Sequence, residues 1–295
     1  MTILDKPMKG SVCMVTGATS GIGKVTARRL AQLGATVVVV GRSRERSATA
    51  VRQIQQQTGN SSVEFMLADL SSQQDIRQLA EEFKRRYQRL DVLVNNAGAI
   101  MFSRQESVDG IEMTLALNHL SYFLLTNLLL EPLKSGAPSR IINVSSSAHH
   151  RAEIDFDDLQ SLKRYRGFRA YARSKLGNLL FTYELARRLE GTGITVNALH
   201  PGLVATNLMA NNGGIGRLLK VLLSLKGISE EEGAQTSIYL ATSPEAEGIT
   251  EQYFVKQKAV PSSQASYDKS AACQLWQASA ELTGLAADHA PPLSF

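Results

Sequence analysis

The sequence has little cysteine and no low-complexity tract or internal repeat. Its 295 residues include two cysteines, Cys13 and Cys273, which lie far apart and form no C-x-x-C pair. Neither a disulfide framework nor a thiolate zinc site is therefore predicted. The 8 prolines are dispersed, so no linker divides the chain, and we expect a single domain over residues 1–295.

Long hydrophobic runs are also missing. The N-terminal stretch MTILDKPMKG has no apolar core and no cleavage signature, so no secretory signal is predicted and a cytoplasmic location is expected. The most apolar stretch, residues 115–133, is interrupted by polar residues and a proline. It falls short of the ~18 uninterrupted apolar residues that a membrane span needs, and we interpret it as a buried core helix.

Charge of one sign is not in large excess. Thirty-two Lys and Arg against 27 Asp and Glu leave a net charge of +5. The basic residues are scattered apart from small groups such as Arg42, Arg44 and Arg46, which argues against a nucleic-acid partner. Hydrophobic residues make up 43% and charged residues 20%, a composition typical of an ordinary globular chain.

Six short apolar runs alternate with amphipathic stretches. Each run is too short for a buried helix and rich in β-branched residues, as in strands that are covered on both faces. In residues 23–33 and 73–87, which lie between these runs, the apolar residues recur at the spacing of an amphipathic helix. This alternation predicts an α/β fold, a single-domain doubly wound parallel sheet with helices on both faces, which binds ligands beyond the carboxyl ends of its strands. The predicted strands are residues 11–16, 35–40, 62–67, 90–95, 139–145 and 193–199.

A glycine-rich turn follows the first predicted strand and leads into a helix. It reads Thr16-Gly17-Ala18-Thr19-Ser20-Gly21-Ile22-Gly23. Gly17 permits a tight turn, while Gly21 and Gly23 let backbone approach a pyrophosphate at the positive helix end. The spacing differs from the common G-x-G-x-x-G and a glycine-rich turn alone is often only a turn, but the strand-to-helix context favours a dinucleotide site.

The end of the second predicted strand indicates which nicotinamide cofactor fits. An NAD site places a carboxylate here to bind the ribose 2′-hydroxyl, but no acid occurs before Glu45. Arg42 instead offers a planar fork that matches phosphate oxygens, so NADP (NADPH) is predicted. Arg44 and Arg46 are interpreted as a solvated charge run that opens the next helix.

Tyr171 and Lys175 are four residues apart in a predicted helix, which sets them on one face. A phenol with a pKa near 10 is a poor acid at neutral pH. A nearby ammonium group stabilises the phenolate, and the positive ring of an oxidised nicotinamide would add to this. Such a tyrosine can give a proton to a carbonyl oxygen. The Y-x-x-x-K pattern is weak by itself and gains its value from the motifs around it.

Further motifs follow in order along the chain: Asp69-Leu70, Asn95-Asn96-Ala97-Gly98, Asn118, Ser146 and Pro201-Gly202 with Thr206. Together with the glycine-rich turn and the Y-x-x-x-K pattern they resemble the short-chain dehydrogenases/reductases, in particular the retinol dehydrogenase-like subgroup, which has a Rossmann fold. The resemblance implies that Ser146 binds the substrate carbonyl oxygen, Tyr171 supplies the proton and Lys175 lowers the tyrosine pKa. It also implies that Asn118 holds a water that links Lys175 to solvent. The residues that match cofactor contacts of the family are Gly17, Thr19, Ser20, Gly21, Ile22, Gly23, Arg42, Asp69, Leu70, Asn95, Ala97, Gly98, Tyr171, Lys175, Pro201, Gly202 and Thr206.

The 25 positions between Ser146 and Tyr171 exceed the gap of many family members, and the extra stretch resembles the insertion of retinol dehydrogenases. Its adjacent His149 and His150 are not predicted to bind metal, because neighbouring histidines point apart and no third ligand accompanies them. A structural role is favoured for them. The family resemblance also allows a light-dependent protochlorophyllide reductase. Such an enzyme uses a cysteine near the substrate, and neither Cys13 in the first predicted strand nor Cys273 in the distal tail suits that position. The intact set of Asn118, Ser146, Tyr171 and Lys175 argues against a catalytically silent NADP-binding sensor or scaffold.

The segment at about 203–228 bears on the substrate. A hinge-like stretch, 211–214, precedes an apolar one, 218–225, which can cover an apolar substrate, lie on a lipid surface or pack as an ordinary helix. We expect the enzyme to interconvert a lipophilic aldehyde or ketone and its alcohol, with retinal and retinol the leading pair. A peripheral membrane contact and a homodimer are left open. The chain after Ser229 should add a helix, a final strand and a closing helix.

Overall fold

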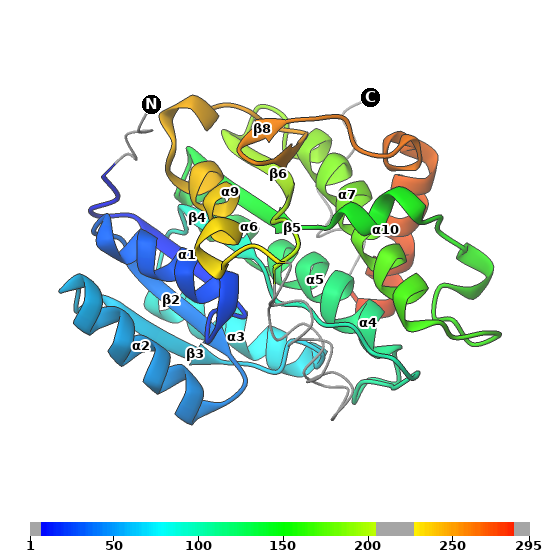
Figure 1. The fold of residues 1–295 in the computed structure, drawn as a ribbon, viewed down its shortest axis with the longest axis horizontal. Coiled ribbons are helices and arrows are strands. Elements are labelled where there is room, and N and C mark those ends of the chain that lie inside the picture. Colours follow the sequence, from blue (N-terminus) through cyan, green and yellow to red (C-terminus); the bar gives the residue numbers. More distant parts are fainter. Residues whose placement is uncertain (1–6, 205–226, 286–295) are drawn as a thin grey trace.

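The computed structural model describes residues 7–204 and 227–285. Within these ranges one eight-stranded sheet lies between two layers of helices (Figure 1). Six strands match the predicted apolar runs to within two residues at each end, and two more follow in the C-terminal part. The strands are β1 (Val12–Thr16), β2 (Thr36–Gly41), β3 (Val63–Leu67), β4 (Val92–Asn95), β5 (Ser139–Val144), β6 (Ile194–His200), β7 (Gln252–Val255) and β8 (Lys258–Ala259).

The strand order is β3-β2-β1-β4-β5-β6-β7-β8, with every pair parallel except the last. The predicted doubly wound parallel sheet is thus confirmed. The order reverses between β1 and β4, and in an open α/β sheet the crevice at such a switch point binds ligands. Val15 aligns with Val39 on one side and Val94 on the other. This register brings the loops after β1, β2 and β4 to the same edge.

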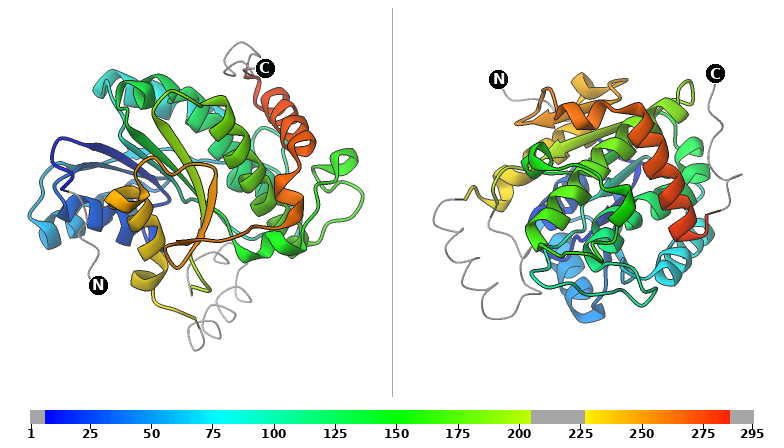
Figure 2. Two further views of the ribbon diagram at one scale, coloured as in Figure 1. Left: turned by 90° about the horizontal axis from the view of Figure 1, so that it is seen from above. Right: turned by 90° about the vertical axis from the view of Figure 1, so that its right-hand side faces the viewer.

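The helices form two layers, seen from two sides in Figure 2. α1 (Gly21–Gln32), α2 (Arg44–Thr58) and α9 (Glu230–Thr242) cover one face, while α3 (Gln73–Arg86), α5 (Ser121–Leu128), α7 (Gly167–Arg188) and α10 (Lys269–Thr283) cover the other. Alternate residues of β1 point toward the two helix layers. Met14 packs with Phe83 and Phe123, whereas Cys13 and Val15 pack into the opposite core. The uniformly apolar strands are explained by this double coverage.

Residues 115–133 are buried as expected, but the prediction of one core helix is wrong. The chain forms α4 (Met113–Leu115), a π-helical turn (Ala116–Leu120), α5 and then α6 (Leu130–Ser135). Pro132 has no N–H to donate to the carbonyl four residues back, which accounts for the break before α6. The π-helical turn widens the backbone at Asn118, and such turns occur frequently at functional sites.

The C-terminal part adds the predicted helix, strand and closing helix. Ser229 caps α9 through a capping box with Glu232, which satisfies exposed N–H groups of the first turn. Trp276 on α10 packs edge-on against Phe123, with ring centroids 4.9 Å apart, and lies under the Arg188 guanidinium at 4.3 Å. α10 therefore packs against both α5 and α7.

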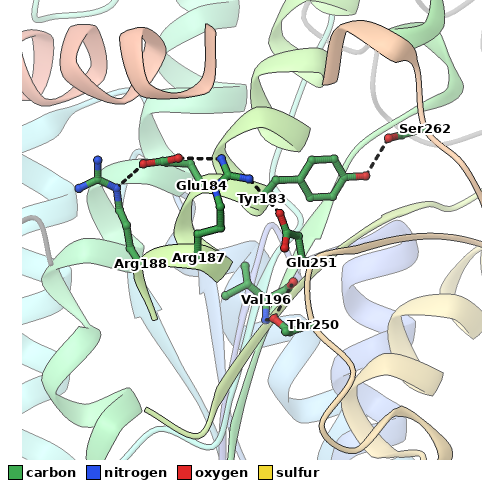
Figure 3. Close-up of polar contacts among 8 residues, drawn as sticks. All are labelled: Tyr183, Glu184, Arg187, Arg188, Val196, Thr250, Glu251 and Ser262. Atoms are coloured by element: carbon green, nitrogen blue, oxygen red, sulfur yellow. Dashed lines mark hydrogen bonds and ion pairs between the residues drawn. The ribbon is translucent and has the colours of Figure 1, made fainter. Parts of the chain in front are cut away.

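A polar network fixes the C-terminal end of α7 (Figure 3). The buried Glu184 carboxylate accepts hydrogen bonds from Arg187 at 2.7 Å and from Arg188 at 2.6 Å. Arg187 also pairs with Glu251 at 2.8 Å, just before β7. A buried carboxylate is stabilised only when it is paired and hydrogen-bonded, so this network anchors α7 to the β6–β7 edge of the sheet.

The segment at about 203–228, with the apolar stretch 218–225, lies mostly outside the described residues, as does Thr206. At its two described ends Val204 pairs with Ile228 in a short bridge. No helix within residues 7–204 and 227–285 combines the length and the apolar character needed to cross a bilayer.

Candidate active site

A cavity of about 600 Å³ opens at the carboxyl ends of the parallel strands. This is the edge at which the sequence predicts the ligand site. Motifs that are separated by up to 185 positions in the chain meet here because their strands are neighbours in the sheet. The predicted site residues that line it are Gly17, Thr19, Ser20, Gly21, Ile22, Gly23, Arg42, Asp69, Leu70, Ala97, Gly98, Ser146, Tyr171, Lys175, Pro201 and Gly202.

The glycine-rich turn can pack this tightly only without side chains. A β-carbon on Gly17 would lie 2.9 Å from Ala97 Cα, and one on Gly23 would lie 2.7 Å from the carbonyl oxygen of Gly17. The turn leads into α1, which has no acidic residue in its first turn. The positive end of the α1 dipole therefore faces the cavity without an internal counter-charge, which suits the pyrophosphate of a dinucleotide.

Thr16 joins this turn to the loop after β4. Its hydroxyl accepts hydrogen bonds from the N–H groups of Asn96 at 2.8 Å and Ala97 at 3.1 Å. The assignment of Asn95 as a cofactor contact stays a prediction, since the structure does not place its side chain in the cavity lining. Its buried side chain donates to Thr126 and Asn143 at 2.9 Å each, within the core. Neighbouring residues of a strand point to opposite sides, and it is Asn96 that lines the cavity.

The cavity runs past the end of β2, where Arg42 is exposed and lines it together with Ser43 and Arg46. Arg46 is exposed near the start of α2, as its interpretation in a solvated charge run requires, and it also lines the cavity. Helical side chains lean toward the helix N-terminus, which brings Arg46 back to the start of α2. Arg44 behaves differently, since its guanidinium lies over the Phe65 ring at 5.9 Å, away from the cavity lining.

The structure distinguishes three consecutive serines after β5. Ser145 is buried and donates to the carbonyl oxygen of Lys175 at 2.8 Å, and Ser147 is exposed outside the cavity. Ser146 lines the cavity, and its Oγ accepts the Ala148 N–H at 3.2 Å. A hydroxyl that accepts one hydrogen bond can still donate its hydrogen, so Ser146 can direct it to Tyr171, with which it hydrogen-bonds, or to a ligand oxygen. Of the three serines, only Ser146 both lines the cavity and has a hydroxyl hydrogen that it can donate to a ligand.

The sequence motifs do not reveal the apolar part of the cavity lining. Met101, Met113 and Leu117 line it, with Gln105 beside them, and they come from segments without a recognisable pattern. The start of α7 presses against this wall, because a β-carbon on Gly167 would lie 2.1 Å from the Met101 carbonyl oxygen. Flexible methionines fit irregular apolar ligands well. This apolar part of the lining therefore suits an apolar chain attached to the reacting group.

Comparisons with known proteins agree with this geometry. Residues 11–214 match the sequence profile of the short chain dehydrogenases. The chain belongs to the short-chain dehydrogenase family. It is therefore an oxidoreductase that acts on CH–OH groups and uses a nicotinamide cofactor.

Its curated relatives match over nearly their whole length. Human retinol dehydrogenase 14 is 44% identical, a match that covers 94% of this chain and 88% of that protein. Human polyprenol dehydrogenase is 43% identical, covering 95% and 87%. Human retinol dehydrogenase 12 is 45% identical, covering 94% and 88%. The resemblance to retinol dehydrogenases is thereby confirmed.

Solved structures of the family share the fold. A protein from Mycobacterium paratuberculosis superposes with a TM-score of 0.78 at 32% identity, covering 95% of this chain and 96% of its own. The NADP active-site complex of RhlG from Pseudomonas aeruginosa has a TM-score of 0.66 at 29% identity, covering 83% and 94%. This dehydrogenase therefore has the Rossmann architecture that the sequence predicts.

Burial controls the electrostatics around Tyr171 and Lys175. Loss of solvent lowers the pKa of Lys175 from its usual 10.5 to about 7. Burial also raises the pKa of Tyr171, opposed by a hydrogen bond with Ser146. Lys175 Nζ donates to the carbonyl oxygen of Val144 at 2.9 Å and lies 5.7 Å from the Tyr171 ring centre. The net shift of the Tyr171 pKa is therefore upward in the ligand-free protein, and the role of Lys175 in lowering that pKa stays a prediction.

This burial predicts a pH-dependent stability. Between about pH 7 and pH 10.5 the unfolded chain binds a proton at Lys175 that the native chain does not, so stability rises with pH across that window. Lys175→Met removes the desolvation penalty and should raise the melting temperature of the ligand-free protein near pH 7, by on the order of 5 °C. Calorimetric scans from about pH 7 to about pH 9 measure both effects.

The matched control for this prediction is Lys134→Met, which changes an exposed lysine on α6. It should leave the pH dependence of the melting temperature as in the wild type. Parallel curves for the wild type and Lys175→Met would show that the lysine is solvated and keeps its ordinary pKa.

Asn118 is buried behind the cavity and does not line it. Its amide donates to the Ala99 carbonyl oxygen at 2.9 Å and to Ser174 Oγ at 3.1 Å, and its oxygen accepts the Ala99 N–H at 2.9 Å. It ties the π-helical turn to the loop after β4 and to α7. A β-carbon on Gly98 would lie 3.2 Å from Asn118 Oδ1 and 3.6 Å from Lys175 Nζ. The role of Asn118 in holding a water stays a prediction.

Within the described part of the chain, no group of three or more His, Cys, Asp or Glu side chains is arranged to hold a metal ion.

Proposed function

We propose that this protein is an NADP(H)-dependent oxidoreductase that interconverts a lipophilic aldehyde or ketone and its alcohol, with retinal and retinol as the leading pair. One observation carries the proposal. A single cavity is lined by the glycine-rich turn and Arg42, by Ser146 and Tyr171, and by the apolar side chains of Met101, Met113 and Leu117. This combination suits a nucleotide, a reacting carbonyl and a hydrophobic chain that are bound in the same cavity.

The residues at the nucleotide end fit NADP. The α1 N-terminus would hold the pyrophosphate, and Arg42 with Arg46 would bind the 2′-phosphate through guanidinium groups matched to phosphate oxygens. The residues that line the cavity at the end of β2 itself, where NAD sites place a carboxylate, are Gly41, Arg42 and Ser43, and none of them is acidic. RhlG, 29% identical, is an NADP complex, which supports the same choice. The bound nicotinamide supplies or accepts the hydride.

The protein's own residues handle the substrate oxygen and the proton. Ser146 donates its hydroxyl hydrogen to the substrate oxygen and stabilises the negative charge that develops there. Tyr171, which hydrogen-bonds with Ser146, gives its proton to that oxygen in reduction and takes one in oxidation. Lys175 lines the same cavity from the next turn of α7. When it is protonated, its charge favours the phenolate that Tyr171 becomes.

The substrate class follows from the apolar wall and from the relatives. Human retinol dehydrogenase 14 and human polyprenol dehydrogenase are named for alcohols that are long isoprenoid chains with a terminal hydroxyl. The Met101, Met113 and Leu117 side chains provide the surface that such a chain would cover. Each buried CH₂ contributes roughly 0.8 kcal/mol, so affinity should increase with the length of the chain.

A substrate panel tests this proposal. The purified protein is given retinal, long-chain aldehydes and a short water-soluble aldehyde, each with NADPH and with NADH. We expect turnover with NADPH and a KM that falls by about fourfold for each added buried CH₂ until the apolar wall is covered. Absence of turnover with every aldehyde of the panel, despite tight NADPH binding, would indicate a nucleotide-binding protein without catalysis.

A further inference from the structure

We infer that His149 is a positioning residue for Ser146. Its buried imidazole holds the Ser146 carbonyl oxygen and is held in turn by the backbone of Ser263, from the C-terminal part of the chain. This inference rests on the proposed function, in which Ser146 binds the substrate oxygen. It assigns a role to a histidine that the catalytic motifs leave out.

The partners of the ring determine its protonation. His149 is fully buried in the 3-10 turn Ser147–Arg151. Its Nδ1 is 2.5 Å from the Ser146 carbonyl oxygen, and its Nε2 is 3.1 Å from the Ser263 amide nitrogen. A carbonyl oxygen only accepts and an amide N–H only donates. The ring is therefore neutral, with its hydrogen on Nδ1 and its lone pair on Nε2.

The far side of the ring is anchored to the helix that carries Tyr171. Ser262 Oγ lies 2.7 Å from the Tyr183 hydroxyl on α7 (Figure 3) and 2.6 Å from Ser266 Oγ. The Ser262 N–H donates to the Tyr267 hydroxyl at 3.0 Å. The backbone that reaches Nε2 is thus fixed by three bonds. His149 connects the loop after β5 to α7 by a route separate from the active site.

The turn that His149 holds also sets the Ser146 hydroxyl. Ser146 Oγ accepts the Ala148 N–H, and the Ser146 carbonyl accepts both the N–H and the ring N–H of His149. A shift of that carbonyl would rotate the turn and redirect the hydroxyl hydrogen. Misplacement of a catalytic group by about 1 Å can lower a rate 10²-fold. The histidine therefore acts on turnover through Ser146 without touching the substrate.

The first test is His149→Phe, which removes both hydrogen bonds but keeps an aromatic ring against Tyr253, whose centroid is 5.0 Å away. We expect kcat to fall about 10- to 100-fold with the dissociation constant for NADPH unchanged. His149→Gln keeps a neutral donor and acceptor and should recover part of the loss. His150→Phe is the matched control at the exposed neighbouring histidine, whose ring lies 4.0 Å from that of His149, contrary to the expectation that the two side chains point apart. Phenylalanine keeps this ring contact, so kcat should equal that of the wild type.

A second variant removes the Ser263 bond by a backbone change. Ser263 has a φ of −66°, the value that proline imposes. Ser263→Pro therefore deletes the N–H that Nε2 accepts without requiring a new φ at this position. We expect kcat to fall in the same direction as in His149→Phe. Wild-type kcat in both variants would overturn the inference.

A double-mutant cycle decides whether the effect passes through Ser146. In a Ser146→Ala background, His149→Phe should cause no further loss of kcat, because the hydroxyl that it positions is gone. If the kcat losses of the two single variants multiply in the double variant, the inference is overturned and His149 is a general structural residue. Wild-type turnover in Ser146→Ala itself would instead contradict the proposed mechanism, so the two failures are distinguishable.

Discussion

Tyr171→Phe is expected to lower kcat by about 10²- to 10⁴-fold, the usual contribution of a general acid. The substitution deletes the proton donor but leaves the buried ring, which packs next to Phe168 with centroids 6.4 Å apart. The glycine-rich turn and Arg42 are untouched, so the dissociation constant for NADPH should change little. Steady-state kinetics with an aldehyde substrate and a fluorescence titration with NADPH measure the two quantities.

Tyr239→Phe provides the matched control for this loss. Tyr239 is a buried tyrosine on α9 that does not line the cavity, so the same chemical change there should leave kcat intact. If Tyr171→Phe keeps more than about a tenth of the wild-type rate, another group supplies the proton. The assignment of Tyr171 as the acid would then be wrong.

Arg42→Ala is expected to weaken NADPH binding by about 1.5 to 3 kcal/mol, the range for a hydrogen bond to a charged group. This corresponds to roughly a 10- to 150-fold higher dissociation constant. NADH lacks the 2′-phosphate, so its affinity should hardly change and the preference between the two cofactors should shrink. Titrations of both cofactors at the same ionic strength give the comparison.

The chain offers a close control in Arg44→Ala. Arg44 is two residues away and lies over Phe65 instead of lining the cavity, so its removal should affect both cofactors little. Arg46→Ala should resemble Arg42→Ala in direction, because Arg46 lines the same end of the cavity. An equal loss for NADPH and NADH in Arg42→Ala would contradict recognition of the 2′-phosphate by this side chain.

Local patterns in the sequence determined the architecture. Strands that are buried on both faces must be apolar along their whole length, so the runs around Val15, Val39 and Val94 could be recognised without any knowledge of their neighbours. A parallel arrangement then brings their carboxyl ends to one edge. The glycine-rich turn could be placed there because only glycine fits a close packing of backbone on backbone. The spacing of Tyr171 and Lys175 on one helix face is equally local.

The tertiary structure alone decided the properties that depend on distant neighbours. Asn95 and Asn96 are adjacent in the sequence, and only the packing of β4 shows that the first enters the core and the second the cavity. The pKa of Lys175 falls because α7 and the sheet remove its solvent. The bond from Ser263 to His149 spans 114 positions. Desolvation and long-range contacts of this kind arise from packing, and no local sequence pattern encodes them.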